Sequence, residues 1–179
     1  MHRLFVALRP PRAIRSLLAD TMHGIADARW QDDSQLHLTA RYIGEVDRRI
    51  AEDIAIELGH VHASPIDARI AGVGAFDRRG RIDAVWAGVT PHEALAGLHR
   101  KVDHALVRLG LPPEGRAYLP HVTLARLPRT ADPVEIERWR AAQAGLTSVA
   151  FRMEHLILFE STLGHDGARY DTIARWPLG

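Results

Sequence analysis

The chain has 179 residues, of which 46% are hydrophobic and 25% are charged, and its formal net charge is +1. A charge so close to zero excludes attraction of nucleic acid by the overall field of the protein, and the absence of cysteine excludes disulfides, thiolate metal sites and cysteine nucleophiles. No apolar run reaches the roughly 20 residues that span a bilayer. We therefore expect one cytoplasmic domain over residues 1–179, or two small lobes that share a core.

The first half of the chain predicts strands and helices in alternation. Period-two apolar patterns bounded by turn residues predict strands at residues 3–8, 36–43, 66–76 and 82–89. Pro11 and Gly24 bracket a first amphipathic helix, and Asp47 is a suitable N-cap for a second one after a strand that Gly44 ends. Asp77 to Gly80 predicts the turn of a hairpin.

The second half repeats this order. Pro91 opens a long amphipathic helix with Leu95, Val102 and Leu106 on one face, and Gly110 ends it. A strand is predicted at 118–126 and a short helix at 133–139, followed by a final hairpin at 153–160 and 168–176. The fold class is therefore α+β, in which one strand-plus-helix unit is used twice.

A short motif occurs in each half of the chain, inside a predicted strand. His37 and Thr39 are two residues apart, and so are His121 and Thr123. Strand periodicity places the two side chains of each pair on one face, with an aliphatic residue between them on the other face. We expect a strand whose back is buried and whose front lines a cleft.

The motif pair gains weight from its context rather than from its rarity. With 11 His and eight Thr in the chain, about half an H-x-T match is expected by chance. Both matches, however, lie in strands and are followed by an arginine. Arg41 is two residues after Thr39 and should face the cleft, whereas Arg126 is three residues after Thr123 and would need a bulge to face it.

Two imidazoles on either side of one phosphate suit acid–base chemistry near neutral pH. One histidine can accept a proton from the attacking nucleophile while the other donates a proton to the leaving oxygen. The Thr39 and Thr123 hydroxyls can donate hydrogen bonds to the non-bridging oxygens, and Arg126 and Arg41 can neutralise charge there. These six residues are the predicted site, which includes no metal and no cofactor.

The sequence resembles the two-histidine (2H) phosphoesterase superfamily, specifically the bacterial RNA 2′,3′-cyclic phosphodiesterases, which are also called 2′-5′ RNA ligases. The resemblance covers nearly the whole chain. It rests on the segments at residues 3–8, 36–39, 43–46, 118–126 and 156–161, with Gly167, Tyr170 and Trp176 near the end.

The resemblance implies a bilobal fold, with two antiparallel sheets backed by helices and related by a pseudo-two-fold axis around a central cleft. Each lobe would supply one H-x-T motif. It also implies hydrolysis of RNA 2′,3′-cyclic phosphate ends to 2′-phosphates without a metal, by a monomer. His37 would be the proton donor and His121 the proton acceptor, and the reverse reaction would join RNA by a 2′-5′ linkage.

Other functions remain open at this point. The same site would serve a phosphodiesterase that acts on small nucleotide cyclic phosphates or on 2′-5′ oligonucleotides. A non-catalytic module that only binds RNA ends is the alternative from another class. Arg78, Arg79 and Arg81 form a tight basic cluster, which is either a solvated hairpin tip or a contact for an RNA backbone.

Overall fold

A computed structural model describes residues 1–179 as one α+β structure. The strands, in chain order, are β1 (His2–Leu8), β2 (Arg29–Trp30), β3 (Leu38–Val46), β4 (Ile66–Arg78), β5 (Arg81–Thr90), β6 (His121–Arg126), β7 (Phe151–Met153), β8 (His155–Gly164) and β9 (Gly167–Pro177). The helices are α1 (Arg12–Ala19), α2 (Arg48–Leu58), α3 (His92–Arg108) and α4 (Pro133–Gln143), with a 3-10 turn η1 (Asp33–Gln35). The predicted α+β class is confirmed.

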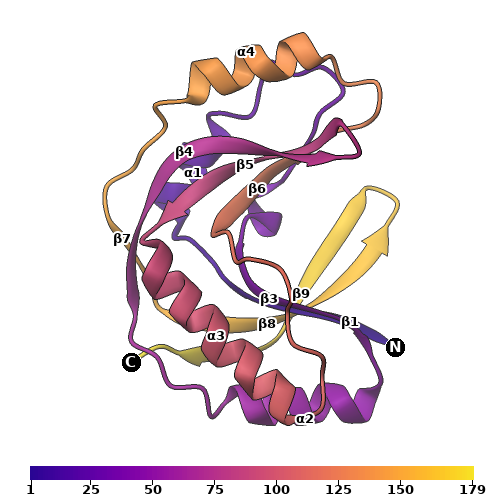
Figure 1. The fold of residues 1–179 in the computed structure, drawn as a ribbon, viewed down its shortest axis with the longest axis vertical. Coiled ribbons are helices and arrows are strands. Elements are labelled where there is room, and N and C mark those ends of the chain that lie inside the picture. Colours follow the sequence, from indigo (N-terminus) through magenta and orange to yellow (C-terminus); the bar gives the residue numbers. More distant parts are fainter.

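The strands form one antiparallel path that divides naturally into two halves. The order is β7-β4-β5-β6-β3-β1-β8-β9, and β2 pairs with β6. Neighbouring strands within each half pair over several residues, but β6 and β3 pair at a single position, Leu38 opposite Val122. These two residues are the central positions of the two H-x-T motifs. The narrow join therefore lets the two halves of the sheet diverge on either side of the motifs (Figure 1).

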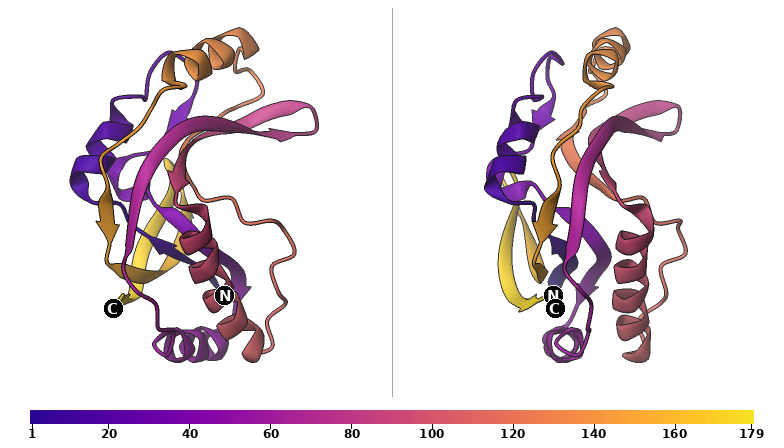
Figure 2. Two further views of the ribbon diagram at one scale, coloured as in Figure 1. Left: turned by 60° about the vertical axis from the view of Figure 1, so that its left-hand side comes forward. Right: turned by 90° about the vertical axis from the view of Figure 1, so that its left-hand side faces the viewer.

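The helices lie around this bent sheet. Figure 1 shows α4 at one end of the molecule and α2 at the other, and Figure 2 shows α1 and α3 on opposite sides of it. The α3 helix packs against both β3 and α2. One hydrophobic cluster includes buried residues from both halves, among them Leu38, Val122, Leu106 and Ile136. We propose on this basis that the chain is one domain of two lobes. No helix is long and apolar enough to cross a membrane.

Local signals account for many of the boundaries. The Asp47 side chain accepts a hydrogen bond from the Ile50 amide at 2.9 Å, so it caps α2 as predicted. Gly110 has φ of 89° just after α3, a conformation that glycine adopts without strain. The β4–β5 turn is also where the sequence places it, since Arg79 and Gly80 both have positive φ, which is typical of a two-residue hairpin turn.

Some predicted boundaries are wrong. Gly44 does not end its strand, because β3 continues to Val46 and tolerates Gly44 at φ of 93°. The first helix ends at Ala19, several residues before Gly24. The short strands β2 and β7 escape prediction because each has only two or three residues and depends on a distant partner, β6 and β4 respectively.

An extra residue follows each H-x-T motif and changes which side chains face the cleft. In β3, Val6 of β1 pairs with Arg41 and Ala7 pairs with Thr39, so Ala40 has no partner of its own. In β6, Val85 of β5 pairs with Ala125 and Trp86 pairs with Thr123, so Leu124 is the extra residue. Such an insertion shifts the alternation of faces by one residue.

Candidate active site

The two H-x-T motifs meet at one cavity of about 200 Å³. It is reached from both halves of the sheet, because β3 and β6 are neighbours at the motifs. Five of the six predicted site residues line it: His37, Thr39, His121, Thr123 and Arg126. The other lining residues are Phe5, Gln31, Gln35, Tyr42, Ser161 and Tyr170. The structure thus brings together two imidazoles that are 84 residues apart in the sequence.

The two histidines are held in the same way. His37 Nδ1 is 2.6 Å from the carbonyl oxygen of Gln35, and His121 Nδ1 is 2.7 Å from that of Leu119. Because a carbonyl oxygen can only accept, Nδ1 of each ring must carry the hydrogen. The neutral ring therefore keeps its lone pair on Nε2. In His37 this atom is 3.1 Å from Thr39 Oγ1, so the Thr39 hydroxyl donates to it.

Aromatic side chains surround both imidazoles but to different degrees. The His37 ring lies 4.8 Å from the ring of Phe5 and 5.2 Å from that of Tyr170, centroid to centroid. His121 meets the edge of Phe76 at 4.8 Å and lies 5.9 Å from Trp86. Fixed rings of this kind limit rotation of the imidazoles, so both histidines are oriented before a ligand arrives.

Burial and neighbouring positive charge make both histidines weak bases. Burial lowers the pKa of His37 to about 4; the carbonyl of Gln35 opposes this effect, whereas His121, Arg126 and Arg9 reinforce it. Burial also lowers the pKa of His121, again with a contribution from Arg126 and against the carbonyl of Leu119. The neutral form of each ring is therefore favoured at pH 7.

The two predicted arginines have different surroundings. Arg126 is exposed and lines the histidine cavity, because the extra residue Leu124 turns it to the face of Thr123. Arg41 does not line the histidine cavity, but it lines a larger cavity beside it that also includes Thr39 and His121. Its side chain is 7% exposed and its Nε lies 2.7 Å from Asp103 Oδ1 on α3.

Arg41 uses its remaining donors on the backbone. Its guanidinium donates to the carbonyl oxygens of Tyr42 and Pro112. The Asp103 carboxylate also accepts from the Glu114 amide at 3.0 Å. Arg41 therefore joins β3, α3 and the loop that leads to β6.

The predicted site does not include Tyr42, which occupies the place that Arg126 has in the other motif. Each residue is the third after the threonine of its motif, and both line the histidine cavity. Tyr42 is 48% exposed, so it does not pack in the core. The signal that could have found Tyr42 is its position three residues after Thr39. That position faces the cavity only because β3 contains an extra residue, which the sequence does not reveal.

A second buried pair anchors the backbone of the first motif. His99 on α3 stacks on Tyr118, with centroids 4.5 Å apart and planes within 2°. His99 Nδ1 is 2.6 Å from the Ala40 carbonyl oxygen, and the Tyr118 hydroxyl donates to the Thr39 carbonyl oxygen at 2.9 Å. Burial raises the pKa of Tyr118, so its hydroxyl stays a donor at physiological pH.

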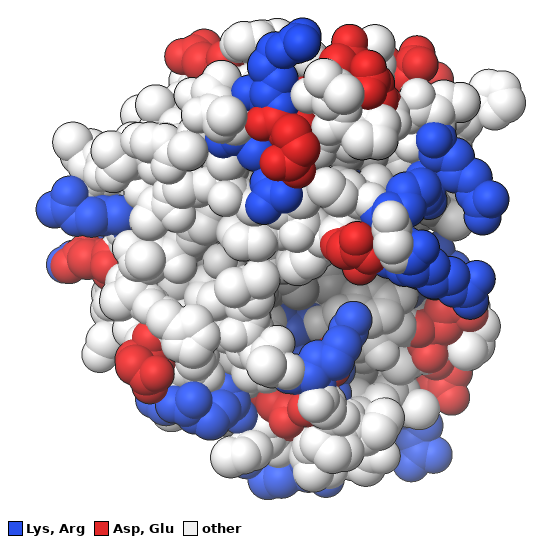
Figure 3. Space-filling model, turned by 45° about the horizontal axis from the view of Figure 1, so that its top comes forward, with Lys and Arg blue, Asp and Glu red and all other residues white.

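A larger cavity of about 420 Å³ adjoins the histidine cavity. The two share Thr39, Tyr42, His121 and Arg126, and the larger one is also lined by Phe76, Tyr118 and Arg116 among other residues. Figure 3 shows a hollow in this face of the molecule, with basic side chains gathered along its right-hand rim. The arrangement offers a small polar chamber for one phosphate next to a wider space with aromatic walls.

Comparison with known proteins gives a consistent result. A family model described as the 2′-5′ RNA ligase superfamily matches residues 9–165. An RNA 2′,3′-cyclic phosphodiesterase of Methanocaldococcus jannaschii is 28% identical over 184 residues, which cover 97% of this chain and 99% of that protein. An RNA 2′,3′-cyclic phosphodiesterase of Geobacillus stearothermophilus is 27% identical over 169 residues, covering 93% of this chain. The chain spans 53% of the length of this second relative.

Solved structures share the fold. The crystal structure of a phosphoesterase superposes with a TM-score of 0.80 at 22% identity, covering 99% of this chain and 98% of that one. The structure of E. coli LigT complexed with 3′-AMP superposes with a TM-score of 0.78, also at 22% identity and with the same coverage of both chains. The predicted 2H phosphoesterase-like fold is therefore confirmed.

Proposed function

Because this chain belongs to the 2′-5′ RNA ligase superfamily, we propose that it is an RNA 2′,3′-cyclic phosphodiesterase that hydrolyses cyclic ends to 2′-phosphates. The relative that matches this chain over 99% of its own length is named for this activity. One observation carries the assignment to particular residues: two imidazoles, each with Nδ1 bound to a carbonyl oxygen, line one phosphate-sized cavity together with two threonines and Arg126.

The first step is binding of the cyclic phosphate in the histidine cavity. Its single negative charge offsets the positive charge of Arg126, which otherwise lowers the pKa of both histidines. Thr39 then turns its hydroxyl from His37 Nε2 to a non-bridging oxygen, and Thr123 donates to the other. Binding thus raises the pKa of His37, so that this ring takes up a proton with the substrate.

The second step is attack by water on phosphorus. His121 accepts a proton from the water at Nε2 while the new P–O bond forms, and protonated His37 donates its Nε2 proton to the 3′ oxygen as the P–O3′ bond breaks. The products are a 2′-phosphate and a free 3′-hydroxyl. The assignment of His37 as donor and His121 as acceptor follows the family. With a 5′-hydroxyl in place of water, the same attack on phosphorus and the same break of the P–O3′ bond would form a 2′-5′ linkage and free the 3′-hydroxyl.

The roles of the remaining groups follow from their contacts. Arg126 stabilises the negative charge that accumulates on the non-bridging oxygens. Arg41 is a positioning residue that holds β3 against α3 through Asp103. The two imidazoles and the two threonine hydroxyls thus supply the proton transfers and the hydrogen bonds without a metal ion, because an imidazole accepts a proton when it is neutral and donates one when it is protonated.

The decisive experiment uses an oligoribonucleotide that ends in a 2′,3′-cyclic phosphate, incubated with the protein in the presence of EDTA. We expect conversion to a 2′-phosphate at a rate that chelation does not change. A His104→Ala variant is the matched control, since His104 is exposed and outside the cavity. A 3′-phosphate product or loss of activity in EDTA would contradict the mechanism, and RNA binding without turnover would favour a non-catalytic end-binding module.

A further inference from the structure

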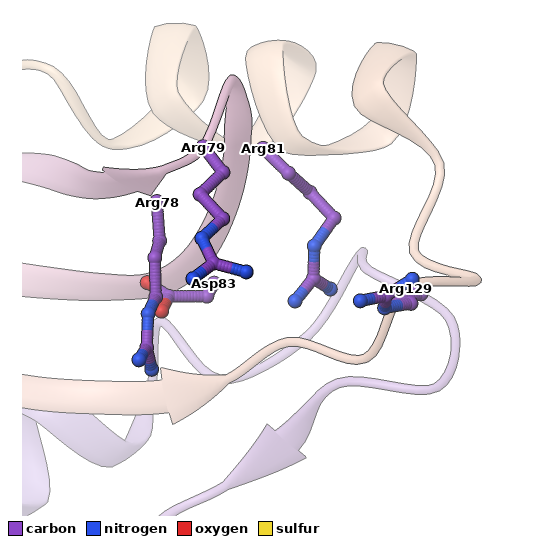
Figure 4. A pocket seen from close by; sticks show the side chains of 5 residues that line it. All are labelled: Arg78, Arg79, Arg81, Asp83 and Arg129. Atoms are coloured by element: carbon purple, nitrogen blue, oxygen red, sulfur yellow. The ribbon is translucent and has the colours of Figure 1, made fainter.

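Four arginines line a separate cavity next to the histidine cavity. Arg78 and Arg79 lie at the end of β4 and in its turn, Arg81 begins β5, and Arg129 lies in the loop after β6. Together they form what we call the arginine cluster. Figure 4 shows the first three side chains running in one direction from the hairpin, while Arg129 reaches toward Arg81 from the neighbouring loop. The cluster therefore joins two segments that are about 50 residues apart in the sequence.

The cavity is built almost wholly of cationic groups. Its volume is about 380 Å³, and its lining consists of the arginine cluster and Asp83, with no hydrophobic residue. None of these four arginines forms an ion pair. Arginines elsewhere in the chain form most of its ion pairs. Arg81 Nη1 is buried from solvent and has no hydrogen-bond partner. A desolvated guanidinium nitrogen without an acceptor is costly, so the space suits an anionic ligand.

The β4–β5 hairpin holds positively charged arginines close together, which destabilises the hairpin. Arg78 and Arg81 are directly opposite each other across the β4–β5 turn, and like charges in such pairs destabilise a hairpin. The turn is nevertheless well defined, because Asp77 Oδ1 accepts from the Gly80 amide at 2.9 Å and Gly80 has φ of 76°. The turn therefore presents the arginines in a fixed direction.

The arginine cluster and the histidine cavity lie along the same pair of neighbouring strands, β5 and β6. Arg126, which lines that cavity, pairs with Ala84 of β5. One residue further, the Leu127 amide donates to the Asp83 carbonyl oxygen at 2.9 Å, and Asp83 lines the arginine cavity. The two cavities are thus connected through consecutive pairs of the β5–β6 ladder, and a chain that leaves the histidines past Arg126 meets the arginine cluster next.

We propose that the arginine cluster binds the phosphodiester backbone of the RNA strand that leads to the cyclic phosphate. The proposal rests on the function proposed above and names its substrate class: an oligonucleotide with several phosphates, rather than a mononucleotide. Arginine suits this task because its planar guanidinium donates two parallel hydrogen bonds to a phosphate. It also explains how a chain with net charge +1 holds RNA, since the positive charge is concentrated where the strand would run.

The test compares two substrates in a triple variant, Arg78→Gln with Arg79→Gln and Arg81→Gln. The control variant removes the same charge from exposed positions on α2 and α3, as Arg48→Gln with Arg49→Gln and Arg100→Gln. The substrates are 2′,3′-cyclic AMP and a ten-nucleotide RNA with a 2′,3′-cyclic phosphate end. Rates are measured as kcat/KM at several salt concentrations.

For the arginine-cluster variant we expect a fall of at least tenfold in kcat/KM on the RNA at low salt, with the mononucleotide rate unchanged within twofold. The slope of log kcat/KM against log salt should fall by about 2, at ~0.7 for each lost phosphate contact. A loss on the RNA no larger than in the control, or an equal loss on both substrates, would overturn the proposal. An unchanged mononucleotide rate also shows that the variant is folded.

A binding measurement separates this proposal from the proposed function. The probe is a 5′-fluorescein RNA of the same length ending in a 2′-phosphate, followed by fluorescence anisotropy. If the wild-type protein hydrolyses neither substrate, the proposed function fails, yet weaker binding of the probe by the arginine-cluster variant alone would still support the inference. Equal affinity in the wild type and both variants would end it.

Discussion

The strands β3 and β6 carry the same motif and the same irregularity, yet they present different chemistry to the cavity. Each has an extra residue immediately after its threonine, Ala40 in β3 and Leu124 in β6. The third residue after the threonine then faces the cavity, and it is Tyr42 in one strand and Arg126 in the other. Arg41, two residues after its threonine, therefore does not line the histidine cavity, whereas Arg126, three residues after its threonine, does.

The surroundings of the two histidines differ as well. His37 lies among Phe5, Tyr170 and Phe159, whereas His121 has two aromatic neighbours on the other half of the sheet. Burial lowers the pKa of both rings, to about 4 in the case of His37. The pseudo-symmetric backbone therefore holds two rings whose readiness to take a proton is set separately by their neighbours.

The largest expected effect comes from removing either imidazole. We expect His37→Ala and His121→Ala each to lower kcat on the cyclic-end RNA by about 10³-fold, within the range for loss of a general acid or base. The readout is single-turnover cleavage with the wild type and His104→Ala alongside. Retention of more than a tenth of the rate by either variant would show that the two imidazoles are not both required.

The second test asks whether Arg41 stabilises the fold. Arg41→Ala leaves Asp103 buried without its partner, and such a loss destabilises a protein by about 3 kcal/mol; the pair is 8% and 13% exposed. Arg48→Ala, which removes an exposed pair with Glu52, should cost about 0.5 kcal/mol or less. Urea unfolding measures both free energies.

Arg126→Ala should behave in the opposite way to Arg41→Ala. Arg126 is exposed and forms no ion pair. The midpoint of unfolding of the variant should therefore stay close to that of the wild type. Its kcat/KM should fall by about 10²-fold, in line with loss of a group that stabilises transition-state charge. A stable but inactive Arg41→Ala, or an unstable but active Arg126→Ala, would reverse the roles that we assign.

The smallest expected effect is a shift of the pH profile. One ring must be protonated and the other neutral, so kcat/KM should be bell-shaped and report both pKa values of the free enzyme. Because both values are lowered, the maximum should lie below pH 6.5 and the rate should fall as pH rises toward 8. Arg126→Gln removes a charge that lowers both pKa values, so its maximum should move to higher pH. A profile that is flat from pH 5 to 9 would contradict paired catalysis.

Much of the fold could be predicted from local patterns alone. The strands and helices follow from apolar periodicity, and the β4–β5 turn follows from the run Asp77 to Gly80, in which glycine adopts a positive φ without strain. The pairing of His with Thr on one face also follows from strand geometry, since that relation lies within two residues of one strand.

The sequence by itself determined the two motifs, their faces and the family resemblance, because each depends on residues close together in the chain. Only the tertiary structure decided that both imidazoles line one cavity and that Tyr42, rather than Arg41, lines it with them. These outcomes depend on how β1 pairs with β3 and how β5 pairs with β6. An extra residue in a strand exists only relative to its partner, so no pattern within the strand reveals it.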